Sequence, residues 1–184
     1  KRQDLVFSNL AVSWGRDIQA IFSGLRRVMK PGAILVFTCF GPDTLAELKS
    51  ACNTADGHSP VPDFPDMHDV GDELVRAGFR EPVMDADRLT LAYPDLSALL
   101  TELEATGITA IGGGKWCETL DTSGSGKLSE TYTRSPTDDR FPAVFEIIYG
   151  TAFAPEEGQP VKTPEGDVAT FSVDSLRVKS TRRV

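Results

Sequence analysis

Two short polar stretches in the N-terminal part of the sequence each follow an apolar run. The first is Ser8-Asn9-Leu10, after Leu5-Val6-Phe7, and the second is Gly41-Pro42-Asp43, after Ala33–Phe40. If both runs are parallel strands, their carboxyl ends lie at one edge of a sheet, where open α/β sheets bind ligands. The asparagine and aspartate could then contact a polar ligand that Trp14 covers. They could equally cap the following segments while Trp14 fills the core, and spacing alone favours this second interpretation.

No set of residues has the spacing of a metal site or of a phosphate-binding loop. His58 and His68 are far apart without a nearby cysteine, and the three cysteines show no paired spacing. The stretch Gly112–Lys115 lacks the flanking strand and the serine or threonine that a phosphate loop has after its lysine. We therefore predict no metal and no disulfide framework, and the polar strand ends remain the candidate site.

The segment between the two apolar runs has the spacing of an amphipathic helix. Asp17 is placed to cap its N-terminus, and Lys30-Pro31-Gly32 predicts its end. Strand, helix and strand in this order predict a βαβ unit, which builds parallel sheets. The near absence of polar side chains in Ala33–Phe40 predicts a strand that is covered on both faces.

The α/β pattern continues along the chain. Helices are predicted within 41–55, 66–79 and 95–107, and strands around Leu89–Tyr93 and within 140–155. Residues 108–139 are rich in glycine, serine and threonine, so we predict a flexible insertion there. We assign residues 1–155 to one domain and residues 156–184 to a polar C-terminal tail.

Composition and charge exclude several classes of protein. The chain has 184 residues, enough for one domain, and a formal net charge of −8. Nucleic acids and anionic membranes both require a cationic surface, which an acidic chain lacks. No apolar run approaches the ~20 residues of a spanning helix, and we expect no signal peptide. We expect a cytoplasmic monomer that binds neither nucleic acid nor membrane.

Four stretches together resemble the later two-thirds of an S-adenosylmethionine-dependent methyltransferase. They are "DLVFSNLAVSW", "LRRVMKPGAILVFTCFGPDTLAEL", "DMHDVGDELVRAGFREPVMDADRLTLAYPD" and "FPAVFEIIYGTAF". The stretch "RRVMKPG" is typical of the whole superfamily. In contrast, "SNLAVSW", "FGPDTLAELK" and "DMHDVGDELVRAGF" resemble the malonyl-acyl-carrier-protein O-methyltransferases of biotin synthesis. The resemblance covers residues 3–107 and 140–177.

The resemblance implies an α/β fold with the Rossmann-like, seven-stranded sheet of class I methyltransferases, present here only from about the fourth strand. Leu5–Asn9 would be the fourth strand, Ala33–Phe40 the fifth, and the strands at 82–93 and 142–153 the final two. The family's glycine-rich turn after strand one and its acidic ribose-binding residue after strand two have no counterpart in the printed sequence. We therefore expect a C-terminal portion of the family's domain, with weak or absent cofactor binding by itself.

The resemblance also implies a reaction: methyl transfer from S-adenosyl-L-methionine to the free carboxylate of malonyl-acyl-carrier protein or malonyl-CoA, an early step of biotin synthesis. That carboxylate is ionised at neutral pH, so no general base is required and we assign no catalytic residue. The residues expected on the cofactor side are Ser8, Asn9 and Leu10. Those expected on the substrate side are Trp14, Phe40, Asp43 and Tyr149.

Two alternatives remain open at this level. The chain could be a catalytically inactive methyltransferase-like assembly or interaction protein, or a methyltransferase for another small carboxylic acid. An acyl carrier protein is acidic, so its docking needs a basic patch, yet the segment 108–139 has few cations. The cations that could form the patch are Arg26, Arg27, Lys30, Lys49 and Arg182-Arg183.

Overall fold

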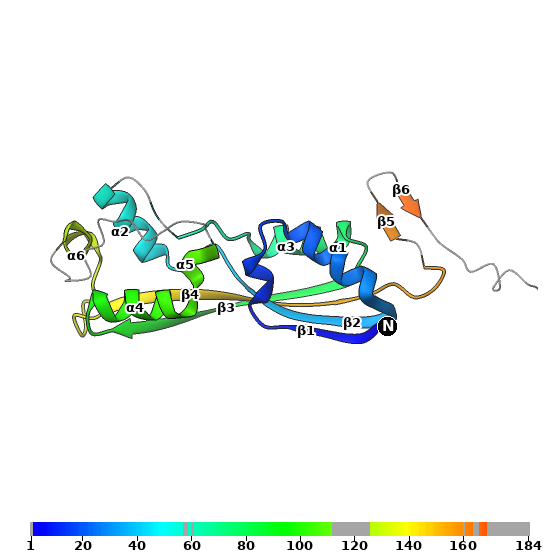
Figure 1. The fold of residues 1–184 in the computed structure, drawn as a ribbon, viewed down its shortest axis with the longest axis horizontal. Helices are drawn as coiled ribbons and strands as arrows, with labels where there is room; N and C mark the ends of the chain where they lie inside the picture. The colour runs from blue at the N-terminus through cyan, green and yellow to red at the C-terminus, as the bar shows by residue number, and fades with distance from the viewer. Residues whose placement is uncertain are drawn as a thin grey trace, which may run out of the picture.

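The computed structural model describes residues 2–56, 59, 61–111, 126–159, 161–163 and 166–168. Its centre is a four-stranded sheet in the order β1-β2-β4-β3 (Figure 1). The strands are β1 (Gln3–Ser8), β2 (Met29–Phe40), β3 (Arg80–Tyr93) and β4 (Phe141–Phe153). β1 and β2 are parallel, whereas β4 is antiparallel to both of its neighbours. The last long strand in the chain therefore lies inside the sheet, between β2 and β3.

β1, α1 (Ile18–Val28) and β2 form the predicted βαβ unit. Asp17 caps α1 as predicted, because its carboxylate accepts a hydrogen bond from a backbone N–H of the first turn. The helix ends within two residues of the predicted position, because α1 stops at Val28, but Lys30-Pro31-Gly32 itself lies inside β2. Gly32 takes a positive φ of 71°, and the register with β1 shifts nearby. The proline and glycine therefore lie in the irregular start of the strand that directly follows the helix.

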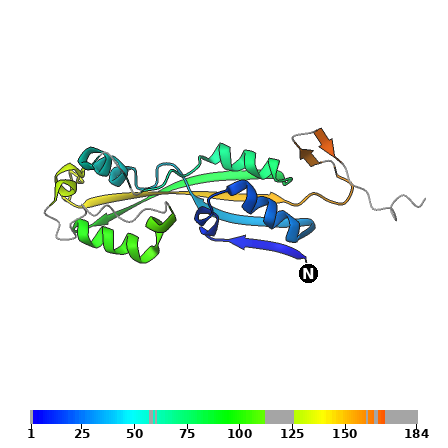
Figure 2. The ribbon, with the colours of Figure 1, turned by 45° about the horizontal axis from the view of Figure 1, so that its top comes forward.

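One face of the sheet is covered by α1 and α3 (Met67–Arg76), as the two views of the ribbon agree (Figures 1 and 2). Phe37 of β2 lies across Gly150 of β4, where a Cβ would come within 2.3 Å of the phenylalanine ring. Only glycine leaves room for the ring at that position. The large members of this buried cluster are Phe22, Met29, Leu35, Phe37, Val70, Leu74, Phe79 and Ile148.

β3 and β4 extend beyond the end of β2, and a second group of helices packs around the extension (Figure 1). Figure 2 shows α4 (Leu96–Thr106) on one side of it, and α2 (Ala46–Asp56) with α6 (Lys127–Thr131) on the other. Asp95 caps α4, as its position in the sequence indicates. The helices enclose a second buried cluster, which includes Phe40, Leu45, Leu48, Leu99, Leu100 and Phe141.

None of the described helices covers the second face of the sheet along β1 and along residues 33–39 of β2. Residues 33–39 of β2 alternate between buried and half-buried, so the prediction of cover on both faces is wrong for the described part of the chain. Leu5 and Phe7 of β1 are 56% and 69% exposed. Val83 of β3 and Phe153 of β4 continue this open face across the sheet. An apolar run predicts the strand, but it does not show which of its faces is covered.

The segment predicted to be a flexible insertion, residues 108–139, contains α5 (Ile108–Ile111) and α6, while 112–125 lies outside the described residues. In the predicted tail, β5 (Val161–Thr163) and β6 (Gly166–Val168) form an antiparallel hairpin, and 169–184 again lies outside the described part. Among the helices that the structure describes, none has the length and apolar character to cross a membrane.

Candidate functional site

The chain turns sharply where β1 ends. Leu10 has a φ of 56°, a left-handed conformation that is strained for a residue other than glycine. Its backbone N–H donates to the carbonyl oxygen of Thr38 at 3.1 Å and to Thr38 Oγ1 at 2.9 Å. Thr38 Oγ1 itself donates to Asn9 Oδ1 at 2.7 Å. One threonine therefore holds both the strained turn and the asparagine side chain at the carboxyl ends of β1 and β2.

A single 3-10 turn, η1 (Ala11–Trp14), continues from Leu10 and contacts the end of β2. Ser13 Oγ accepts a hydrogen bond from the backbone N–H of Phe40 at 2.9 Å. Sequence analysis missed Ser13 and Thr38 because their partners are 27 to 29 residues away, a separation that carries no local pattern.

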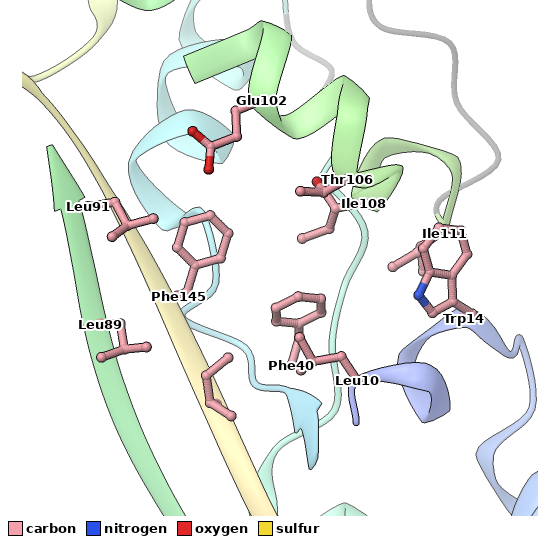
Figure 3. A pocket seen from close by; sticks show the side chains of 11 residues that line it. Leu10, Trp14, Phe40, Leu89, Leu91, Glu102, Thr106, Ile108, Ile111 and Phe145 are labelled. Carbon is pink, nitrogen blue, oxygen red and sulfur yellow. The ribbon is translucent and has the colours of Figure 1, made fainter. Parts of the chain in front are cut away.

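A cavity of about 430 Å³ lies beside these strand ends (Figure 3). In the figure, the rings of Phe40 and Phe145 lie in the space between β3–β4 and α4. Glu102 and Thr106 of α4 add polar groups to a lining that is otherwise mostly apolar. The volume is within the usual range for a small-ligand site. The apolar lining includes Leu10, Trp14, Phe40, Leu89, Phe145 and Ile147.

A second cavity, of about 570 Å³, shares Phe40 and Ile111 with the first. Its lining is more polar, because Ser13, Arg16 and Asp63 contribute to it. Asp63 also forms an ion pair with Lys49 of α2. Two neighbouring cavities of unlike polarity therefore lie next to the carboxyl end of β2.

A row of polar residues crosses the open face of the sheet beside the first cavity. Thr38 of β2 is paired with Tyr149 of β4, and Tyr149 is paired with Asp85 of β3. Directly paired residues of antiparallel strands share a face. The next pair on this face, Phe40 with Ile147, lines the cavity. Tyr149 therefore lies on the face that leads into the apolar space, in register with the threonine that holds Asn9.

Asp43 lies in a different environment, in the turn between β2 and α2. Its carboxylate pairs with Arg88 of β3 at 2.5 Å, and Arg88 is 3.4 Å from Glu146 Oε1. Glu146 Oε2 accepts the backbone N–H of Asp43 at 2.9 Å, and the Thr44 hydroxyl bonds to the Glu146 backbone. The side chains of Asp43 and Thr44 therefore both bond to residues of β3 or β4, and α2 begins only at Ala46. The expected helix cap is replaced by a network that closes the turn.

Two groups near the site have raised pKa values. Burial, and then the neighbouring Glu102 carboxylate, raise the pKa of Tyr93, the last residue of β3. Burial raises the pKa of the Cys39 thiol to about 12, as expected for a small buried apolar residue. Both groups therefore stay protonated at neutral pH, and neither is a base there.

The structure brings most of the predicted site residues together. Leu10, Trp14 and Phe40 line the first cavity, Tyr149 belongs to the polar row beside it, and Asn9 is hydrogen-bonded to Thr38 of that row. Ser8 ends β1 in register with Phe37, on the helix-covered face. Asp43 belongs to the lining of neither cavity. The roles of these residues remain predictions, and Thr38 and Ser13 join them as groups that shape the site.

The chain has sequence relatives among known proteins. No family model matches it. Over 152 residues it is 43% identical to a malonyl-[acyl-carrier protein] O-methyltransferase of Gallionella capsiferriformans, covering 83% of this chain and 52% of that protein. Over 180 residues it is 35% identical to the protein of the same name from Xylella fastidiosa, covering 96% of this chain and 60% of that protein. The chain thus spans about half to three-fifths of the length of these relatives.

A solved structure from Bacillus halodurans C-125, provisionally described as a methyltransferase, shows the same fold. It matches with a TM-score of 0.50 and 14% sequence identity, over 84% of this chain and 65% of that one. The predicted Rossmann-like α/β fold is confirmed by this match, and the predicted family resemblance by the sequence relatives. The chain is therefore a homologue of the malonyl-[acyl-carrier protein] O-methyltransferases, and it has the fold of a class I methyltransferase.

Proposed function

We propose that this chain supplies the substrate-binding part of an enzyme that transfers a methyl group from S-adenosyl-L-methionine to the free carboxylate of malonyl-acyl-carrier protein. The relatives that carry this name support the proposal. The structural observation that carries it is the apolar cavity at the carboxyl end of β2, bordered by Asn9, Thr38 and Tyr149. By the same resemblance, the reaction would be an early step of biotin synthesis.

The reaction requires positioning and not proton transfer. A carboxylate is ionised near neutral pH, so its oxygen can attack the methyl carbon while the carbon–sulfur bond breaks and its electron pair stays on sulfur. A carboxylate and a sulfonium thus become a neutral ester and a thioether. Because charge disappears along this path, a water-poor apolar site favours it, provided that the two groups are held in line. The mostly apolar lining around Phe40 and Phe145 fits this requirement.

The residues present fit the methyl donor at the edge formed by β1 and β2. Ser8, Asn9 and Leu10 stand at the carboxyl end of β1, the usual place for a ligand of an open α/β sheet. The second cavity, lined by Val12 and Ser13 of the turn that follows them, has a suitable volume and a mixed lining. S-adenosyl-L-methionine would supply the methyl group there. Weak retention of it by the 184-residue chain alone remains our expectation.

The substrate side follows from the first cavity. Trp14 and Phe40 would contact the acyl arm, and Tyr149 would lie toward the carboxylate on the open face. Asp43 was predicted here too, but its ion pair with Arg88 supports a part in holding the turn. Malonyl-CoA offers the same acyl group and is the second substrate to compare.

Within the described residues the predicted docking cations lie at two separate places, and Arg182-Arg183 lies outside that part of the chain. Arg26, Arg27 and Lys30 are near the amino end of β2, the opposite end of that strand from Phe40, and Lys30 pairs with Asp4 at 2.7 Å. Lys49 instead pairs with Asp63, which lines the second cavity. We therefore propose that the acidic carrier docks on the Lys49 side. The net charge of −8 supports our expectation that the protein binds neither nucleic acid nor an anionic membrane, and a cytoplasmic monomer remains a prediction.

The test is methyl ester formation on malonyl-acyl-carrier protein by the full gene product, read from the intact mass of the carrier. We expect one added methyl on the malonyl carrier and none on an acetyl carrier, which has no free carboxylate. Methylation of a free dicarboxylic acid alone would favour a different small-acid substrate. Binding of S-adenosylhomocysteine without any methylated product would show that the proposed substrate is wrong, and absence of both would favour an interaction protein.

A further inference from the structure

The hydroxyl of Thr38 is the only hydroxyl group in β2. The other residues of that strand after Gly32 are apolar. Its Oγ1 receives the Leu10 N–H at 2.9 Å and lies 2.7 Å from Asn9 Oδ1. The shorter distance is typical of an O–H donor to oxygen, whereas amide N–H donors usually lie nearer to 2.9–3.0 Å. The threonine hydrogen therefore points to Asn9, and the asparagine presents its oxygen to Thr38.

This arrangement determines where the donor end of the Asn9 amide points. An asparagine side chain has one acceptor oxygen and an NH₂ group with two donors on the opposite side of the amide. Since the oxygen is held by Thr38, the NH₂ group faces away from β2. Among the described residues, no hydrogen bond from Asn9 Nδ2 is present, and the residue is exposed. Two N–H donors are thus presented at the carboxyl end of β1, next to the strained turn at Leu10.

We propose that Thr38 is a positioning residue that turns the Asn9 amide so that its NH₂ group binds a carboxylate of a bound reactant. This inference rests on the function proposed above, which brings two carboxylates to the site. One is on the malonyl group, and the other is on the amino-acid part of the methyl donor. Both are acceptors of the chemistry that an amide NH₂ group recognises.

The test uses three variants of the full gene product. Thr38→Val keeps the shape but removes the hydroxyl, and Thr38→Ser restores it. Asn9→Asp keeps an acceptor for Thr38 but replaces the NH₂ donors with a second oxygen. Thr151→Val is the matched control, because Thr151 lies on the same face of the neighbouring strand, in register with Val36 and one pair further from the cavity.

Two ligands distinguish the possible carboxylates. S-adenosylhomocysteine carries the amino-acid carboxylate, and 5′-methylthioadenosine lacks it. If Asn9 binds that carboxylate, Thr38→Val and Asn9→Asp should each lower the affinity for S-adenosylhomocysteine by about 10-fold or more. The affinity for 5′-methylthioadenosine should stay the same. If Asn9 binds the malonyl carboxylate, KM for malonyl-acyl-carrier protein rises by a similar factor while both nucleoside affinities stay the same. In either case Thr38→Ser should recover most of the loss.

Three results would overturn the inference. The first is an unchanged affinity and KM in both Thr38→Val and Asn9→Asp. The second is an equal loss of affinity for both nucleosides together with a lower melting temperature of the variant, which indicates a structural role alone. The third is a loss of the same size in Thr151→Val. Because the binding measurements need no turnover, they remain informative if malonyl-acyl-carrier protein proves not to be the substrate.

Discussion

The two faces of the sheet are made by the same strands and differ in what covers them. Leu35 and Phe37 of β2 are fully buried beneath α1 and α3, whereas their neighbours Ile34 and Val36, on the opposite face, are only half-buried. On β1, Phe7 is 69% exposed. The apolar residues of the two faces are alike, so the difference arises from the placement of the helices.

The open face is also where the proposed chemistry lies. Thr38 and Tyr149 occupy it at the point where the apolar surface reaches the cavity, whose far side is formed by α4. The covered face carries the packing that stabilises the sheet, and the open face carries the polar row. Substitutions on the two faces should therefore have different consequences, and the following experiments test this contrast.

The largest contrast is expected between two phenylalanines of neighbouring strands. Phe37→Ala removes a fully buried ring and should lower the free energy of unfolding by about 3–5 kcal/mol. Phe7→Ala removes an exposed ring, and its effect should stay within about 0.5 kcal/mol. Urea denaturation of both variants measures the difference. A comparable loss in Phe7→Ala would show that the open face is covered in solution.

A pair of glycine substitutions should give effects of opposite sign. Gly150→Ala would place a Cβ 2.3 Å from the Phe37 ring, so we expect a loss of about 1–3 kcal/mol in the free energy of unfolding. Gly71 lies in α3, where an added Cβ would be 3.8 Å from Cγ of Met84, so Gly71→Ala should stabilise the protein by about 0.5–1 kcal/mol. Thermal melts of the two variants provide the comparison. A stable Gly150→Ala would mean that the ring of Phe37 can move aside.

A charge on the open face should change association more than stability. Phe7→Lys interrupts the exposed apolar surface of an edge strand, and we expect less self-association of the 184-residue chain with a change in unfolding free energy within about 0.5 kcal/mol. Light scattering over a concentration series measures this. Gln3→Lys is the matched control, because it adds the same charge to β1 without removing apolar surface. Equal behaviour of the two variants would assign the effect to charge alone.

The smallest effect concerns the helix cap of α3 on the covered face. Hydrogen bonds from the backbone N–H groups of Asp69 and His68 lower the pKa of the Asp66 carboxyl. Its contribution to stability should therefore be complete above the unfolded pKa, about 3.9, and disappear as the pH falls through the lower folded value. The difference between the wild type and Asp66→Ala, measured by urea denaturation at several pH values, should shrink only in that acidic range. A difference that is constant down to low pH would contradict this linkage.

Local patterns predicted much of the fold. The N-caps at Asp17 and Asp95, the helix within 66–79 and the βαβ unit follow from short-range rules that need no partner. The start of β2 was the exception, because Lys30-Pro31-Gly32 has the composition of a turn after a helix and also suits the irregular start of a strand. The choice between the two depends on pairing with β1.

The site was less predictable than the fold. Leu10, Trp14 and Phe40 could be selected because they lie at or just after the ends of two predicted strands, where the family resemblance implies a site. Thr38 could not, since within β2 it looks like any half-buried strand residue. Asp43 has the same local signature as Asn9, but it pairs with Arg88 from a distant strand.

The sequence by itself determined where most helices and strands lie and which family they resemble, because caps, periodicity and motifs are encoded by neighbouring residues. Only the tertiary structure decided that β4 is inserted between β2 and β3, and that Glu146 therefore reaches Thr44, 102 residues away. It also decided which face of β2 is covered and that Thr38 holds Asn9. Such pairings depend on the relative placement of whole elements, for which short segments of sequence carry no signal.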